Sequence, residues 1–523
     1  MLTKKKARKP SRQDRFIGKP TGQIQERVRR VGPEHFGIVA VDCAKRRSKW
    51  MLCDYYGKVL VEPTIVEHTS GGLRTATQLV RAACKSMQLT DAIIAVEMTG
   101  IYHKPVQRAF REAGFDTRTV HPFASSHYRK PLHPDLKTDD HDLEAIFHAA
   151  VKGYGLCTLP VNGVYSSLQS LSRHRQNLVK QRARTMIQIR QLMHQTMPGF
   201  ADLYDDNKFF HQSIALPVAL RFPSAEAIKQ AGRKRMAKHL ASVGVRCQSA
   251  SIDRVIAWAS DAADSSELAS LLTRQWQDLD QVRRLLSDQI MATEQEMSGF
   301  LAKTPYVLLL SVTGIHVVSA ARLAGEAGPI ELYATSRAHT GRAGLYPSRY
   351  QSDEVDHDQG TLVRQCNRRL RSAAMLIAEN LIKCHPHFRG LSSLWTAQKV
   401  DPRDRRCRIA NRAMRMVFQL VSGGQYWRGH GIPSDRILAK LQEFHRVHKT
   451  CAATTIHDMQ RALQWIPKSA HAHEAEPFLT RTRRCGPRRL GDLLLPVLAR
   501  LGVAVDEAIE GVKSSTSEAR SSD

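Results

Sequence analysis

Two short apolar runs that each end in a carboxylate constrain the fold most. Phe36–Asp42 and Ala92–Glu97 have the length and apolar character of buried strands. A charged carboxylate is costly to bury without a partner, so an acid that closes such a strand is expected at the edge of a sheet, where it can join a site. The alternative is that Asp42 and Glu97 are ordinary acids that face a loop.

Helices and further strands alternate with these runs. The predicted elements are a hairpin over 50–63 with its turn at Gly57, a helix over 70–86, a helix near 103–113 and a strand near 117–120. Strands that alternate with helices predict an α/β sheet with covering helices.

A third acidic segment begins a helix. Thr138 can cap the helix, and the acids that follow fill its first turn, where the helix dipole favours negative charge. Asp139 and Asp142 are three residues apart and share a face, whereas Asp140 is expected to point away. A well-capped, solvated helix start explains the pattern equally simply.

Together, the strand-end acids and the helix acids form a set of four. Carboxylate oxygens are the ligands that Mg²⁺ prefers. Asp42, Glu97, Asp139 and Asp142 could therefore hold two Mg²⁺ (or Mn²⁺) ions about 4 Å apart, the arrangement that supports phosphodiester cleavage.

The charge of the chain indicates a polyanionic partner. Lys and Arg number 78 against 49 Asp and Glu, a formal net charge of +29 that favours salt-sensitive binding to nucleic acid. No apolar run approaches the ~20 residues of a membrane span, and the basic N-terminus lacks the apolar segment of a signal peptide. Ten cysteines without a C-x-x-C pair fit reduced thiols in a cytoplasmic protein.

Composition and periodicity divide the chain into segments. We expect a basic flexible arm over 1–33, a catalytic α/β domain over 34–155, a helical coiled-coil region over 156–300 with an insertion at 200–265, a mostly helical domain over 301–430, and a basic C-terminal extension over 431–523 with a disordered end.

The coiled-coil prediction rests on leucine spacing. Leu272, Leu279 and Leu286 recur every seven residues within a helix expected near 266–301. An intramolecular antiparallel pair and a seam between subunits both fit this pattern.

Three acidic blocks carry a resemblance to a known family. Val41–Lys45, Glu97–Tyr102 and Lys137–Asp142 resemble, in order and spacing, the blocks of the DEDD transposases of bacterial insertion sequences of the IS110 kind. The resemblance implies a RuvC-like, RNase H-fold domain in which Asp42, Glu97, Asp139 and Asp142 are catalytic and bind metal. It also implies a bacterial cytoplasmic protein that forms dimers or tetramers through a coiled coil.

The later part of the chain resembles the second domain of the same family. Val307–Ala321 is similar to its helix–Gly–helix opening, which suits phosphate contacts, although His316 replaces a usual glycine. Gly341–Ser352 looks like the block that carries the nucleophilic serine, and by this match the candidate is Ser352 rather than Ser348. Nearby arginines are candidate nucleic-acid contacts, namely Arg349, Arg364, Arg368, Arg369, Arg371, Arg405 and Arg406.

The resemblance implies a DNA transposase/recombinase that cleaves and rejoins donor and target DNA through a serine, guided by a noncoding bridge RNA. One rival hypothesis is a RuvC-like metal-dependent nuclease or junction resolvase, which uses the four acids and water without a covalent serine step. The other is a non-catalytic nucleic-acid scaffold, in which the positive charge matters and the acids do not.

Overall fold

The computed structural model describes residues 23–132, 136–153, 156–157, 163–204, 209–211, 214–348, 350–352, 355–357, 360–364, 366–427, 433–466, 479–482 and 486–489. The first part of the predicted arm (1–22) and the predicted disordered end lie outside these residues. The chain divides into two units, Met1–Pro160 and Val161–Asp523.

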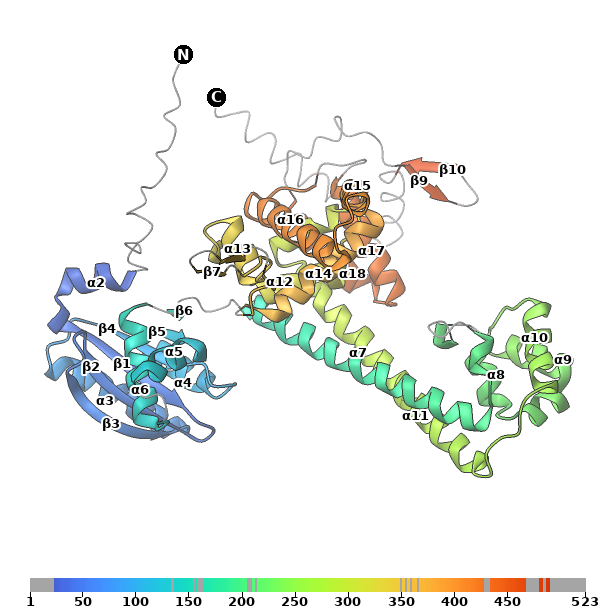
Figure 1. Ribbon diagram of the computed structural model, residues 1–523, viewed down its shortest axis with the longest axis horizontal. Helices are drawn as coiled ribbons and strands as arrows, with labels where there is room; N and C mark the ends of the chain where they lie inside the picture. Colours follow the sequence, from blue (N-terminus) through green and yellow to red (C-terminus); the bar gives the residue numbers. More distant parts are fainter. Residues whose placement is uncertain are drawn as a thin grey trace, which may run out of the picture. The chain divides into compact units, whose positions relative to one another are not determined.

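A mixed six-stranded sheet forms the first unit (Figure 1). Its strand order is β3-β2-β1-β4-β5-β6. Strand β1 is antiparallel to β2 and parallel to β4, and β4 is parallel to β5. The strands are β1 (Phe36–Cys43), β2 (Arg47–Asp54), β3 (Val59–Glu67), β4 (Asp91–Glu97), β5 (Asp116–Val120) and β6 (Leu156–Cys157). The predicted α/β sheet is confirmed, with the hairpin turn at Gly57 (φ 93°).

Helices cover both faces of the sheet. Helices α3 (Ser70–Ser86) and α4 (His103–Glu112) pack on the face to which Val39 and Val41 point. The opposite face, with Ile38 and Ala40, packs against α2, α5 and α6, whose bounds are Gln23–Val31, Pro122–Leu132 and Asp139–Val151. Because side chains alternate along a strand, Asp42 lies on the face covered by α6.

Helix α2 corrects one expectation. The sequence predicts a flexible arm up to residue 33, but Gln23–Val31 is helical and buries Ile24 and Val28 against the sheet. These two apolar residues are four apart, so they share one helix face. Arg27 adds an ion pair in which its Nε donates to Asp91 Oδ2 at 2.8 Å.

Two long helices form the frame of the second unit. Helices α7 (Gly163–Thr196) and α11 (Ala269–Leu301) lie side by side in opposite directions (Figure 1). Leu178 of α7 packs against Leu286 and Ile290 of α11, and Arg182 Nη1 donates to Ser287 Oγ at 3.3 Å. The leucine repeat therefore serves an intramolecular antiparallel pair.

A separate apolar core lies at one end of this pair. Helices α8 (Ala215–Arg221), α9 (Ala225–Ser242) and α10 (Ser249–Ser260) pack around Trp276 of α11. The segment predicted as an insertion is thus largely helical, as expected. Its helix α9 is broken at Gly232, where φ is 59°.

The other end of the pair enters a larger core. It contains a 3-10 helix (Pro305–Ser311) and α12 (Val317–Ala327), α13 (Ser336–Arg342), α14 (Arg368–Cys384), α15 (Pro386–Ala397), α16 (Pro402–Ser422), α17 (Pro433–Val447) and α18 (Ala452–Leu463). The structure also describes two short hairpins, β7 (Tyr350–Ser352) with β8 (Val355–His357) and β9 (Leu479–Thr482) with β10 (Gly486–Arg489). None of the described helices has the length and apolar character needed to cross a membrane.

Candidate active site

The strand register brings the two strand-end acids together. Val41 of β1 is paired with Val96 of β4, so Asp42 and Glu97 follow at the same level of neighbouring parallel strands. Both side chains belong to the sheet face that α6 covers. The prediction that these acids close buried strands is therefore consistent with the observed sheet.

Helix α6 brings the other two acids to the same edge. Its N-cap Thr138 accepts a hydrogen bond from the His141 backbone N–H at 3.3 Å. Leu143 and Ile146 are buried against the sheet, and Asp139 and Asp142 extend the same helix face toward the N-terminus.

The electrostatics show that the four carboxylates interact. Burial raises the pKa of Asp42 to about 6, and the negative charges of Glu97, Asp142 and Asp139 contribute further. Burial also raises the pKa of Asp142, although Arg129 and Lys137 oppose this effect. The fold thus gathers negative charge at the carboxyl ends of β1 and β4.

Helix α5 supplies partners that the sequence analysis did not identify. Glu97 accepts hydrogen bonds from the Ser125 hydroxyl and, at 3.1 Å, from Thr99 Oγ1. Arg129 Nε lies 3.1 Å from Asp142 Oδ1. Ser125 and Arg129 are four residues apart on α5, so one helix face orients two of the four acids.

Asp140 also lies beside the site, although the sequence analysis expects it to point away. Its Oδ1 forms a 2.7 Å ion pair with Nζ of Lys49. Lys49 is the residue of β2 paired with Asp42 of β1. The Asp140–Lys49 pair therefore flanks the four acids and joins α6 to the sheet.

The donor set has the chemistry of a divalent-cation site. Four carboxylates offer only oxygen ligands, and a cation would relieve the repulsion that raises the pKa of Asp42. As the side chains stand, no three His, Cys, Asp or Glu residues in the described ranges are placed to hold a metal ion together. Glu97 is bonded to Ser125 and Asp142 is paired with Arg129, so side-chain rotation would have to accompany binding.

The block around the candidate serine is described only in part. Ser352 ends β7, where its backbone pairs with Val355 of β8; its side chain and the whole of Arg349 lie outside the described residues. Ser348 donates its hydroxyl to the carbonyl of Thr361 at 2.9 Å. Its hydroxyl is therefore engaged in holding the loop.

Several of the predicted arginine contacts have structural partners. Arg371 donates through Nε to Ala343 O at 2.9 Å, through Nη2 to Gly344 O at 3.0 Å, and also to Val363 O. This guanidinium therefore holds the turn at Gly344, whose φ is 62°. Arg406 pairs with Glu379 at 2.8 Å, and Arg405 Nη1 donates to the Thr396 hydroxyl.

Three other predicted arginines are free to meet a ligand. Arg364, Arg368 and Arg369 are exposed and form no ion pair within the described part of the chain. Arg368 and Arg369 begin α14, where the helix dipole disfavours positive charge. A phosphate at this position would offset that repulsion.

The helix–Gly–helix opening forms the turn expected from its glycine. Gly314 has a φ of 92°, and a Cβ there would lie 3.0 Å from Asn380 O, so only glycine fits. His316 has an extended φ of −117° that any residue adopts. Its backbone N–H donates to Ser319 Oγ at 3.0 Å and so helps cap α12.

Two family matches cover these segments. Residues 39–198 match the DEDD transposase of the IS110 type, and the match contains all four acids. Residues 306–393 match the family described as Transposase IS116/IS110/IS902 family, and this match contains Gly314 and Ser352. No curated protein matches the chain.

Proposed function

The chain belongs to the IS110-type DEDD transposases and is a DNA transposase/recombinase, and we propose that it exchanges DNA strands through a covalent serine link. Asp42, Glu97, Asp139 and Asp142 are the proposed metal-binding residues of its RuvC-like domain. The observation that supports the metal site is the pairing of Val41 with Val96, which brings Asp42 and Glu97 to the same level of neighbouring strands, where they interact with Asp139 and Asp142 of α6.

Bound Mg²⁺ or Mn²⁺ would supply charge neutralisation at the scissile phosphate. The four carboxylates would hold the cation, with Ser125 and Arg129 orienting Glu97 and Asp142 from α5. Asp140 and Lys49 would keep the start of α6 against the sheet. The exposed Arg368 and Arg369 are proposed contacts to the DNA backbone.

The proposed nucleophile is Ser352. Its hydroxyl oxygen attacks the scissile phosphorus, the bond to the 3′ oxygen breaks, and the 5′ phosphate becomes joined to the serine. The proton of the serine hydroxyl passes to the departing 3′ oxygen, which becomes a 3′ hydroxyl. The 3′ hydroxyl of the partner strand then attacks this phosphoserine and releases the serine. No phosphodiester is lost to hydrolysis. The engagement of the Ser348 hydroxyl with Thr361 O supports Ser352 over its neighbour.

A noncoding bridge RNA that pairs with donor and target DNA, and a homo-oligomer that joins two sites, complete the proposal. The net charge of +29 supports a large polyanionic partner. Helices α7 and α11 bury Leu178 and Leu286 against each other within one chain. An oligomer would therefore have to use another face of these helices.

Trapping of the covalent intermediate tests the mechanism. Protein purified with its RNA is incubated with end-labelled donor DNA and Mg²⁺ and then denatured. We expect a protein–DNA adduct that peptide mapping places on Ser352. Ser352→Ala should abolish the adduct, whereas Ser348→Ala, as the matched control, should retain it.

Two results would contradict this mechanism. Mg²⁺-dependent cleavage that Ser352→Ala leaves unchanged would favour the nuclease that uses water. Salt-sensitive binding without any Mg²⁺-dependent product, in the presence of the RNA, would favour a non-catalytic scaffold.

A further inference from the structure

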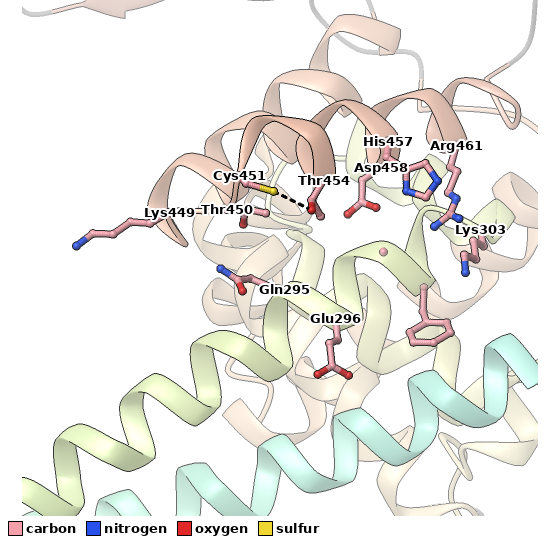
Figure 2. Close-up of a pocket in the computed structure, with 12 residues that line it drawn as sticks. Gln295, Glu296, Lys303, Lys449, Thr450, Cys451, Thr454, His457, Asp458 and Arg461 are labelled. Carbon is pink, nitrogen blue, oxygen red and sulfur yellow. Dashed lines mark hydrogen bonds between the residues drawn. The ribbon is translucent and has the colours of Figure 1, made fainter. Parts of the chain in front are cut away.

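A pocket of about 430 Å³ lies between α11 and the segment that joins α17 to α18. Residues 295–303 form one wall and residues 449–461 form the other (Figure 2). Its volume lies within the range of small-ligand sites. The second wall lies beyond both matched segments, which end at residues 198 and 393.

Positive charge gathers at one end of this pocket. Figure 2 shows Lys303, which follows α11, on the same side of the pocket as His457 and Arg461 of α18. Neither Lys303 nor Arg461 has an ion-pair partner among the residues that the structure describes. Lys303 Nζ lies 5.0 Å from the centre of the Phe300 ring. An anion bound at this end of the pocket would be attracted by both cations.

Two acids also line the pocket, and neither forms an ion pair with these cations in the described part of the chain. In Figure 2 the carboxylate of Glu296 points away from Lys303 and Arg461. Asp458 is 1% exposed, and its Oδ2 lies 3.2 Å from Nε2 of the buried His445. A Cβ on Gly299 would lie 3.3 Å from Asp458 Oδ1, so a side chain there would crowd the floor. The charge of Asp458 is thus directed toward His445.

One polar group on the wall is available to a ligand. Gln295 donates its amide N–H to His448 O at 2.7 Å, so its own amide oxygen remains an acceptor. The hydroxyl oxygen of Thr450 is buried and does not face a ligand. The pocket therefore combines cations with an amide oxygen.

We propose that this pocket binds a phosphorylated nucleoside unit of an RNA or DNA strand. Lys303 and Arg461 would contact the phosphate, and Gln295 would hydrogen-bond the sugar or base. The choice of a nucleotide over other phosphorylated molecules rests on the proposed function. None of the four acids lines the pocket, and neither does Ser352, so the pocket would serve as an anchoring site.

Cys451 provides a direct readout of occupancy. This exposed residue lines the pocket, and its pKa is lowered by hydrogen bonding from the Thr454 side chain and backbone. Its thiolate should therefore react readily with iodoacetamide. Cys384 of α14 is also exposed and lies outside the pocket lining, so it serves as an internal control.

The experiment measures alkylation of both cysteines by mass spectrometry in the full-length protein. The probes are uridine 5′-monophosphate, inorganic phosphate, and ten-residue RNA and DNA strands. At a ligand concentration of ten times Kd, alkylation of Cys451 should slow about tenfold, because about one pocket in eleven is then empty. Cys384 should be unaffected. The stronger of the RNA and DNA effects identifies the strand.

Arg461→Ala should remove the protection, whereas Lys383→Ala, which removes an exposed cation of α14, should retain it. Equal protection of Cys384, or no protection of Cys451 by any probe, would overturn the proposal. Inorganic phosphate that protects as well as the nucleotide does would overturn the assignment to a nucleotide. Ser352→Ala protein should show normal protection, so a failure of adduct trapping alone removes the strand-exchange mechanism and leaves the pocket intact.

Discussion

The two units of the molecule differ in how their charged side chains are paired. In the α/β unit, four carboxylates meet at the ends of β1 and β4, and burial together with the negative charges of the other three acids raises the pKa of Asp42 to about 6. In the helical unit, many arginines are used to hold the fold. Arg173 Nε, for example, lies 2.8 Å from an oxygen of the fully buried Glu326, and Arg436 donates to Ser311 O at 2.6 Å.

This difference indicates which charged residues are candidates for binding a ligand. Like charges that the fold brings together without full neutralisation require a ligand to relieve them. An arginine that donates to backbone carbonyls or to a buried acid already has its hydrogen-bond partners within the fold. The net charge of +29 therefore predicts a polyanionic partner but does not identify the residues that contact it.

The largest expected effect is on the acidic site. Asp42→Asn should reduce Mg²⁺-dependent DNA cleavage by at least about 100-fold, because it removes a charge from the proposed cation site. Cleavage of labelled donor DNA measures the loss. Asp140→Asn is the control, since its carboxylate is 58% exposed and pairs with Lys49; it should cost less than about fivefold. Equal losses in the two variants would contradict the assignment of the four acids.

The next effect separates structural arginines from candidate contacts. Arg371→Ala leaves three carbonyls without their donor and should lower the free energy of unfolding by about 3 kcal/mol. Arg369 lies at an exposed position two residues earlier, and Arg369→Ala should change the free energy of unfolding by less than about 0.5 kcal/mol. The same variant should bind nucleic acid more weakly, and the salt dependence of its binding should fall by about one released counterion. Denaturant titration and binding at several salt concentrations measure both. A stable Arg371→Ala protein would contradict the structural role.

The sequence was sufficient to predict the sheet because its strands are continuous apolar runs between turn residues. The predicted helix over 70–86 coincides with α3, and β4 begins one residue before its predicted start. The four acids could be selected because each closes a strand or opens a helix. Their mutual interaction was a hypothesis until the register of Val41 with Val96 placed two of them side by side.

Other parts of the site were not accessible from the sequence. Ser125 and Arg129 belong to α5, which carries a proline at its end (Pro131) and lacks a clear apolar stripe. The partner of Arg371 is a set of backbone carbonyls, for which no side-chain pattern exists. The pocket beside Lys303 depends on the packing of α18 against α11, which are about 150 residues apart in the chain. Local periodicity does not report such contacts.

A smaller effect concerns the stability of the metal-free acidic site. The pKa of Asp42 is raised above its ordinary value of 3.8 to about 6. The protonated Asp42 carboxyl therefore makes its full contribution to the free energy of unfolding below pH 4, and this contribution is lost as the pH rises through 6. At pH 8 without metal, Asp42→Asn should unfold at a higher temperature than the unmodified protein, and at pH 4 the difference should vanish. Mg²⁺ should stabilise only the unmodified protein at pH 8; stabilisation of both would contradict binding at Asp42.

The smallest effect tests whether the helical unit also contains an unrelieved charge. Lys440 of α17 donates to Val312 O at 2.6 Å and to Ile315 O at 2.8 Å, and so braces the turn at Gly314. Burial lowers the pKa of Lys440 from 10.5 to about 7. Between these two pH values the folded state binds fewer protons than the unfolded state, so stability should rise with pH.

Lys440→Met removes this titration. The free energy of unfolding of the unmodified protein should increase from pH 7 to pH 9, and the increase should be smaller in Lys440→Met. Denaturant titrations at the two pH values measure the difference, with Lys303→Met as the control because Lys303 is exposed. Identical pH dependence in all three proteins would show that Lys440 is not held as a buried cation.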